Sequence, residues 1–312
     1  GIEDLAANDI EAISFIYNVP LWLINLWIRE FGRDKTEDLC AWFNEQPKLT
    51  ARINTILIDI PQCLTMLNEQ GWAVTQDSNY EDIIYINSHR GSLEKSEAFI
   101  KGYITFMDKA SMLVARLVNP QPGERILDCC AAPGGKSMYM ATLMDNVGSL
   151  MSCDIHEHKI ELMNSNADRL GASIVHTKVQ DATKLPDSWN SYFDRVLVDA
   201  PCSGLGILQK KLDMRWRKQE SILSELPPLQ LAILERAAMT VKEKGYLIYS
   251  TCTLNYKENE EVVESFLQKH KEFSIIPVAD DFPLKSNSGM ITTYPPTDDM
   301  DGFFMVKMQR IS

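Results

Sequence analysis

Short apolar runs alternate with amphipathic stretches through the last two thirds of the chain. The amphipathic stretches, such as 157–171 and 227–245, have apolar residues at i, i+3 and i+4 spacing and predict helices. The apolar runs predict strands: ERILDCC, GSLMSCD, SIVHTK, DRVLVDA, YLIYST and GFFMVKMQ. Buried strands that alternate with helices are typical of a doubly wound, mostly parallel sheet. Residues 106–312 are therefore expected to form a Rossmann-like α/β domain.

The first hundred residues follow a different pattern. Residues 1–50 have helical spacing of apolar residues in PLWLINLWIREFG and KTEDLCAWFNEQ, which predicts a helical segment. Residues 51–105 have the pattern of a small α+β, RRM-like domain. ARINTILIDI predicts a strand, a helix follows near PQCLTMLNEQG, and WAVTQ and DIIYIN are short β-rich runs. Because the aromatic signature of RNA-binding RRM domains is not evident, we expect this domain to be accessory.

Cysteine usage and hydropathy limit the class of protein. The seven cysteines are an odd number and form no C-x-x-C pair, which disfavours a disulfide framework or a zinc site and favours reduced thiols. No apolar run approaches the roughly 18–20 residues of a membrane span, and no secretory signal is visible. We therefore expect a cytoplasmic monomer without a membrane or metal partner. Cys40, Cys63 and Cys153 are expected in the core.

Charge is distributed unevenly. The net charge of -12 by itself argues against a nucleic-acid partner. Residues 1–100 hold 7 basic and 16 acidic side chains, however, whereas residues 101–220 hold 15 and 14. Within the second region, QKKLDMRWRK is either a solvated charged face or a phosphate-binding strip with Trp216 available for stacking. The candidate RNA-binding residues of this basic strip are Lys210, Lys211, Arg215, Arg217 and Lys218.

Chemically unusual residues follow five consecutive predicted strands. In a parallel sheet these strand ends share one edge, where ligands bind. Aspartates also cap helices and glycines also make turns, but the repetition at every strand end favours a ligand site. The candidates are CAAPGGK at 130–136 after the first strand, Asp154 after the second, Asp181 past the third, Asp199 and Cys202 after the fourth, and Thr251 and Cys252 after the fifth.

The loop after the first strand indicates the class of cofactor. Gly134 and Gly135 open a helix, where backbone N–H groups favour an anion, and Asp154 lies 20 residues past Gly134, at the spacing of a ribose-binding acid. The G-x-G-x-x-G and G-x-x-x-x-G-K-[ST] fingerprints are absent, which disfavours NAD and ATP. S-adenosylmethionine fits what remains. The expected cofactor-binding residues are Cys130, Ala131, Ala132, Pro133, Gly134, Gly135, Lys136, Asp154, Asp181 and Asp199.

These motifs resemble those of a known family. DCCAAPGGKS, DAPCSGLG, YSTCT followed by NEEVV, and the terminal DGFF resemble the RNA cytosine-5 methyltransferases of the Nop/Sun group. GSLEKSEAFIKGYITFMDKASMLVA and DIHEHKIELMNSNADRLG are most similar to its bacterial RsmB/Sun (Fmu) branch, which modifies a cytosine of small-subunit rRNA. The resemblance covers about residues 20–312. It implies an S-adenosylmethionine-dependent methyltransferase that acts on 16S rRNA.

The resemblance also implies roles for two cysteines. In this family the Thr-Cys cysteine, here Cys252, attacks carbon 6 of cytosine, and the Pro-Cys cysteine, here Cys202, assists product release. DNA cytosine methyltransferases attack with the Pro-Cys cysteine instead, so the chemistry alone leaves the choice open. Asp199 is expected to hold the protonated ring nitrogen 3.

Some alternatives stay open at the level of sequence. Sister enzymes act on tRNA or on other rRNA cytosines with the same motifs. A non-catalytic rRNA-binding assembly factor and an oxidoreductase are the readings from other classes. Members of this branch usually begin with a NusB-like helical domain, which is not seen here, and the chain begins at Gly1; we therefore expect a piece of a longer protein or a processed end. Leu212 stands where the branch usually has proline, so the local backbone after DAPCSGLG is expected to differ.

Overall fold

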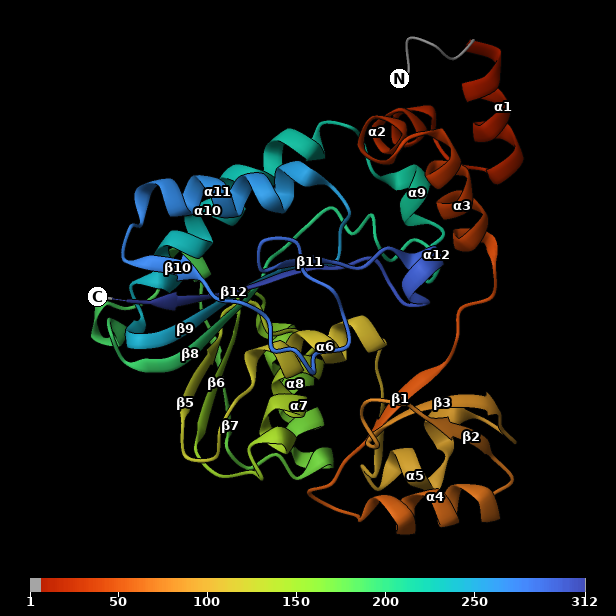
Figure 1. The fold of residues 1–312 in the computed structure, drawn as a ribbon. Coiled ribbons are helices and arrows are strands. Elements are labelled where there is room, and N and C mark those ends of the chain that lie inside the picture. Colours follow the sequence, from red (N-terminus) through yellow and green to blue (C-terminus); the bar gives the residue numbers. More distant parts are fainter. Residues whose placement is uncertain (1–6, 312) are drawn as a thin grey trace.

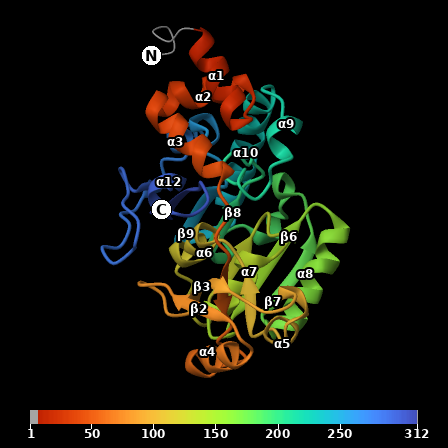
Figure 2. The ribbon, with the colours of Figure 1, turned by 90° about the vertical axis from the view of Figure 1, so that its right-hand side faces the viewer.

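The computed structural model describes residues 7–311 and divides into three packed parts (Figures 1 and 2). Three helices lie at the N-terminal end: α1 (Ala7–Tyr17), α2 (Leu21–Phe31) and α3 (Arg33–Asn44). Their apolar faces share one core with Leu205, Leu208, Leu223 and Leu254, which lie in or next to loops of the larger domain. The helical segment therefore packs directly against the loops that follow the strands of that domain.

No single helix within residues 7–311 is long and apolar enough to cross a membrane. Helices α1 and α2 together have the length and apolar composition of a membrane span, but the pair is bent by 112° at the break between them. In α2, the apolar side chains Leu23, Ile24 and Trp27 are fully buried in the protein core.

The small domain is a four-stranded antiparallel sheet with strand order β2-β3-β1-β4. Its order along the chain is the βαββαβ of a ferredoxin-like fold, and α4 and α5 cover one face (Figure 1). Its elements are β1 (Thr50–Ile53), α4 (Ile60–Glu69), β2 (Ala73–Gln76), β3 (Ile83–Ser88), α5 (Glu97–Ile100) and β4 (Ile104–Phe106).

Two sequence-based expectations for this domain need correction. The strand expected over 51–60 ends at Ile53, because the buried Asn54 side chain donates hydrogen bonds to the carbonyls of Gly102 (2.9 Å) and Leu170 (2.8 Å) and the chain turns there. Strand β4, which was not predicted, crosses the boundary expected at residue 105.

The large domain contains an eight-stranded sheet with order β10-β12-β9-β8-β5-β6-β7 and β11 paired to β12. Strands β5 to β9 are mutually parallel, whereas β10, β11 and β12 pair antiparallel. The strands are β5 (Arg125–Asp128), β6 (Ser149–Asp154), β7 (Val175–Val179), β8 (Phe193–Asp199), β9 (Val241–Thr251), β10 (Phe273–Ile275), β11 (Met290–Thr292) and β12 (Phe304–Arg310).

Alternating side chains of these strands feed two separate cores. Ile126, Leu197 and Ile248 face the core formed with α6, α7 and α8, whereas Val196 and Leu247 face the core formed with α10 and α11. Helices therefore cover both faces, as expected for a doubly wound sheet (Figure 1). The helices are α6 (Lys109–Val118), α7 (Gly135–Leu143), α8 (Glu157–Leu170), α9 (Met214–Arg217), α10 (Ile222–Ala238), α11 (Glu260–Lys269) and α12 (Pro295–Asp298).

The helix expected over 227–245 is shifted toward the N-terminus. Helix α10 begins at Ile222, so that Pro227 and Pro228 lie inside it, and it ends at Ala238. Strand β9 then begins at Val241, which pairs with the first residue of β8. The backbone N–H and C=O groups of this segment are hydrogen-bonded by pairing with β8, and a longer helix would have satisfied them equally well. Periodicity alone therefore did not locate the end of the helix.

Candidate active site

The loop between β5 and α7 forms the floor of a cavity at the carboxyl edge of the sheet. Gly134 has a φ of 99°, and an added Cβ would lie 3.1 Å from the side chain of Met163, so glycine fits this turn. Beneath the loop, Ser137 donates to the Asp128 carboxylate at 2.7 Å. Burial raises the pKa of Asp128 to about 7, and its second oxygen has no hydrogen-bond partner in the described part of the chain.

The acids after β6 and β7 line the same cavity. Asp154 accepts the backbone N–H of His156 at 3.0 Å, which orients its carboxylate. Asp181 caps a 3-10 turn and accepts from the N–H and the hydroxyl of Thr183 at 2.9 and 2.7 Å. These hydrogen bonds hold the pKa of Asp181 below its usual value, so it is anionic at neutral pH. Asp181 is thus both a structural cap and a wall residue.

The strand ends of β8 and β9 bring a lysine, an aspartate and a serine together. Lys136 Nζ lies 2.7 Å from Asp199 Oδ2, and Ser250 Oγ donates to Asp199 Oδ1 at 2.8 Å. The Lys136 side chain is also buried close enough to Cys252 for the two to interact electrostatically. A cation therefore faces a thiol at this edge of the sheet.

The two cysteines at the strand ends touch. Cys202 Sγ and Cys252 Sγ are 3.2 Å apart, and the backbone N–H of Cys252 points to Cys202 Sγ at 3.3 Å. The hydrogen bond with Cys252, burial and the charge of Glu258 together raise the pKa of the Cys202 thiol well above its usual value. Both cysteines are half-buried and line the cavity.

The remaining cysteines lie elsewhere or beneath the loop. Cys40, Cys63 and Cys153 are fully buried, as predicted. Burial raises their pKa values to about 12, 11 and 12, which keeps these thiols protonated and unreactive at neutral pH. Cys129 is buried, and Cys130 lines the cavity at its floor.

The cavity has a volume of about 470 Å³. Asp154, Asp181, Asp199 and the two cysteines line it, and Ile155, Ala182, Pro201, Ile207 and Ile233 give it apolar walls. This arrangement fits an adenosine whose ribose meets a carboxylate and whose cationic tail meets acids, with the cysteines beyond it. No cluster of three or more histidine, cysteine, aspartate or glutamate side chains within residues 7–311 could hold a metal ion.

A set of residues behind the cysteines was not identified from the sequence. The Glu258 side chain is fully buried and accepts hydrogen bonds from Ser203, Gln230 and Asn255. Glu258 directly precedes the NEEVV motif, but its partners are 3, 28 and 55 residues away in sequence. A local pattern therefore carried no signal for this contact.

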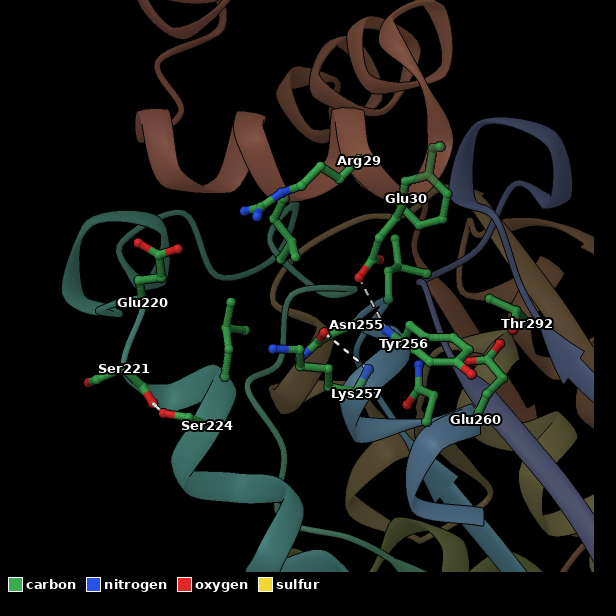
Figure 3. Close-up of a pocket in the computed structure, with 15 residues that line it drawn as sticks. Arg29, Glu30, Glu220, Ser221, Ser224, Asn255, Tyr256, Lys257, Glu260 and Thr292 are labelled. Atoms are coloured by element: carbon green, nitrogen blue, oxygen red, sulfur yellow. Dashed lines mark hydrogen bonds between the residues drawn. The ribbon is translucent and has the colours of Figure 1, made fainter. Parts of the chain in front are cut away.

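A second and larger cavity, of about 850 Å³, lies between α2, the start of α10 and the segment after Cys252 (Figure 3). Glu30 of α2 points down toward this segment and accepts the backbone N–H of Tyr256 at 3.3 Å (Figure 3). Burial raises the pKa of Glu30 to about 7. None of the predicted site residues lines this cavity.

The basic strip divides into residues that pair with distant segments of the chain and residues that do not. Lys210 bridges Asp108 and Asp301, and Arg215 is 2% exposed and donates to Phe43 O and Asn44 Oδ1. These two cations thus have partners within the chain. Lys211, Arg217 and Trp216 lie on the surface and Lys218 is half-buried; Trp216 is 60% exposed. Met214, within the same segment, lines the sheet-edge cavity.

Two family models match the chain. Residues 115–309 match the model described as 16S rRNA methyltransferase RsmB/F, and residues 19–91 match the ferredoxin-like domain of RsmF/B-like methyltransferases. The first match covers the sheet edge described above, and the second covers α2, α3 and most of the small sheet.

Curated proteins and solved structures are similar over most of the chain. A probable ribosomal RNA small subunit methyltransferase B of Bacillus subtilis is 37% identical over 93% of this chain and 66% of its own length. Its counterpart in Synechocystis is 36% identical over 94% and 67%. The crystal structure of PH0851 has a TM-score of 0.90 at 32% identity and covers 96% of this chain and 68% of that one. NSun6 from Pyrococcus horikoshii with SFG has a TM-score of 0.84 at 21% identity, covering 92% and 97%, and supports the fold alone.

The chain spans about two thirds of the length of these curated relatives. The comparisons confirm the predicted α/β methyltransferase fold, with its ferredoxin-like domain. They also confirm the methyltransferase class, for which S-adenosylmethionine is the cofactor.

Proposed function

Because the chain belongs to the RsmB/F family of rRNA methyltransferases, we propose that it methylates carbon 5 of a cytosine in 16S rRNA. The observation that carries this proposal is the contact between the thiols of Cys202 and Cys252 beside the Lys136–Asp199 pair. A non-catalytic protein that only binds rRNA would not need two contacting thiols next to a buried cation. Bound S-adenosylmethionine supplies the methyl group from its sulfonium centre.

Cys252 is the proposed nucleophile. Carbon 5 of cytosine is a poor nucleophile, and addition of a thiolate to carbon 6 converts the ring into an enamine that can take up a methyl group at carbon 5. Only the thiolate attacks, and the ammonium of Lys136 lies close enough to Cys252 to interact with it electrostatically. Asp199, at the end of the neighbouring strand β8, holds the proton on ring nitrogen 3, which spreads the developing charge.

Cys202 is the proposed partner in release. After methyl transfer, the proton on carbon 5 passes to water, its bonding electrons form the double bond between carbons 5 and 6, and Cys252 Sγ leaves carbon 6 as the thiolate, which restores the aromatic ring. Cys202 retains its proton because its pKa is raised, and its sulfur is in contact with that of Cys252. It can therefore exchange a proton with the departing sulfur without moving.

The acids and the loop glycines position the cofactor. We assign Asp154 to the ribose hydroxyls and Asp181 to the adenine side of the cavity, and the loop 130–136 to the methionine tail. Asp128 beneath this loop is fully buried and supports the loop through its hydrogen bond with Ser137, so it is not assigned to the ligand. Asp199, the third acid expected at the cavity from the sequence, is assigned to the cytosine ring instead.

The decisive experiment compares the two cysteines. Cys252→Ala removes the nucleophile, so we expect neither methylated 16S rRNA transcript nor covalent adduct, with a loss of more than about 10⁴-fold in rate. Cys202→Ala leaves attack possible but slows release, so a protein–RNA adduct should survive denaturing electrophoresis. The double variant should lose that adduct.

Cys63→Ala, which removes a thiol from the core of the small sheet, is the control and should methylate at the parental rate. An adduct in Cys252→Ala with none in Cys202→Ala would reverse the two roles. Bisulfite sequencing of 16S rRNA, other rRNA and tRNA from cells lacking the gene would identify the target, and modification lost only from tRNA would replace the proposed substrate. We retain the cytoplasmic location and the monomeric state as predictions.

A further inference from the structure

Glu258 is a buried acid that the proposed reaction leaves without a role. It ends the 3-10 turn Tyr256–Glu258 and its side chain has no exposed surface. Both of its oxygens are occupied: Oε2 accepts from Ser203 N–H (2.8 Å) and Gln230 Nε2 (2.9 Å), and Oε1 accepts from Ser203 Oγ (2.5 Å) and Asn255 Nδ2 (3.0 Å). Its two oxygens thus accept four hydrogen bonds, which is the full acceptor capacity of a carboxylate.

This carboxylate has no ion-pair partner within residues 7–311, which is unusual for a buried charge. Its charge is instead offset by hydrogen bonds from three separate segments. Such an arrangement is costly to bury, so a role beyond packing is expected of it.

The donors to Glu258 belong to the two cysteine loops. Ser203 directly follows Cys202, and Asn255 lies three residues after Cys252. The hydroxyls of Ser203 and Thr253 are themselves 2.8 Å apart, so the residues that follow the two cysteines are joined. Gln230 adds a third tie, because its amide also donates to Pro201 O at 3.0 Å, directly before Cys202.

We infer that Glu258 is a positioning residue for both cysteines. Its hydrogen bonds hold the Cys202 loop against the Cys252 loop, and its negative charge keeps the proton on Cys202 while Cys252 attacks. This inference rests on the proposed function, because it assumes that Cys252 is the nucleophile. It also gives a reason why two thiols that lie 3.2 Å apart and are similarly exposed would have different roles.

The groups around the thiol pair support this assignment. Three groups near Cys202 can carry a negative charge: Cys252 directly after β9, Tyr249 of β9, and Glu258 of the 3-10 turn. Helix α10 contributes the uncharged amide of Gln230, which is bonded to Pro201 O. The Glu258 charge is among the causes that raise the pKa of Cys202. On the other side of the pair, α7 contributes Lys136, which is paired with Asp199. A negative charge thus lies near one thiol and a positive charge near the other.

The test replaces Glu258 with glutamine, which keeps its size and removes its charge. The glutamine oxygen can accept from Ser203 N–H and Gln230 Nε2, and its amide can donate to Ser203 Oγ, whose hydroxyl can turn to Thr253; only the contact with Asn255 Nδ2 is lost. We expect kcat for methylation of a 16S rRNA transcript to fall at least tenfold, since small displacements of reacting groups are costly. The Kd for S-adenosylmethionine should stay within twofold of the parent, because Glu258 does not line that cavity.

A pH profile separates the charge effect from a packing effect. If Cys202 must be protonated, removal of the nearby negative charge lowers its pKa, so the alkaline limb of kcat should move about one unit toward lower pH in Glu258→Gln. Glu258→Asp keeps the charge but shortens the side chain, so its alkaline limb should stay with the parent and its kcat should exceed that of Glu258→Gln. Glu261→Gln, an exposed glutamate on α11, is the matched control and should match the parent throughout.

A kcat within twofold of the parent in Glu258→Gln, or a reduced kcat with an unmoved alkaline limb, would overturn the inference. If Glu258→Gln does not fold, Ser203→Ala replaces it: loss of the hydroxyl should lower kcat several-fold with an unmoved limb, and a parental kcat would overturn the inference. Failure of the proposed function is a distinct result, since it would show as methylation by Cys252→Ala.

Discussion

The sheet-edge cavity and the cavity beneath α2 differ in what their walls can do. The larger one, at about 850 Å³, is bounded by α2 and the segment after Cys252 and contains no residue predicted to act in catalysis or cofactor binding. The smaller one, at about 470 Å³, collects side chains from the ends of β5, β6, β8 and β9 and from the connection that follows β7. Parallel topology therefore identifies the site better than volume does.

The carboxylates of the two cavities show why. At the sheet edge, Asp199 is paired with Lys136 and Asp181 is held anionic by Thr183. Beneath α2, Glu30 accepts one backbone N–H and forms no ion pair within the described residues, and burial raises its pKa to about 7. The sheet-edge cavity therefore presents charged side chains that are held in place for a ligand. In the cavity beneath α2, the burial of Glu30 is offset by a single hydrogen bond.

Of the substitutions that compare the two cavities, the one at the acid that we assign to the ribose should have the largest effect. Asp154→Ala removes the carboxylate at the end of β6, and we expect S-adenosylmethionine to bind roughly thirtyfold more weakly, or about 2 kcal/mol, as for the loss of a hydrogen bond to a charged group. Calorimetry measures this directly. Glu161→Ala, an exposed acid on α8, is the control. Equal affinity in Asp154→Ala, or preferential binding of NAD, would remove the sheet-edge cavity as the cofactor site.

A smaller effect is expected at the surface between the two cavities. The basic strip lies there, because Met214 lines the sheet-edge cavity and Glu220 lines the larger one. Replacing Lys211, Arg217 and Lys218 together with alanine should weaken RNA binding about tenfold near physiological salt. The slope of log K against log salt should flatten by about 2 units, since each phosphate contact on a single strand contributes about 0.7.

Titrations at several salt concentrations test this, with cofactor binding expected to stay unchanged. The matched control places the same three substitutions at the opposite edge of the sheet, at Lys244, Lys269 and Lys271. If both triple variants show the parental slope, the strip is a solvated face. If the slope flattens by the same amount in both triple variants, the attraction of RNA depends on the overall charge of the protein rather than on this surface.

The sequence was most informative where chemistry and topology coincide. Alternating strands and helices predicted a parallel sheet, and a parallel sheet places Asp154, Asp199 and Cys252 along one edge whatever the loops do. The contact between the two thiols is a consequence of the neighbouring positions of β8 and β9 in the strand order. The order itself was not predicted, because strand pairing depends on contacts between distant segments.

Contacts between distant segments of the chain could not be predicted from the sequence. Lys210 and Arg215 have the same local pattern as Lys211 and Arg217, but Arg215 lies against the end of α3 and Lys210 between Asp108 and Asp301. Glu258 was missed for the same reason, since two of its three partners, Ser203 and Gln230, come from other segments. The end of α10 at Ala238 was misplaced because β9 pairs from Val241 onward, and this competition is tertiary.

The smallest effect on methylation is expected from the larger cavity, and here the measurement is stability. Glu30 has a pKa of about 7 in the folded protein and about 4.5 when unfolded, so the folded state binds more protons between these values. The free energy of unfolding should therefore fall as pH rises from 5 to 8, by about 1–3 kcal/mol from this group. Glu30→Gln cannot ionise and should show a shallower decline by that amount, with kcat within twofold of the parent. Denaturant unfolding at pH 5 and pH 8 measures the difference, and Glu11→Gln, an exposed acid on α1, provides the reference. A tenfold loss of kcat in Glu30→Gln at an unchanged pH dependence of stability would instead assign the larger cavity a part in the reaction.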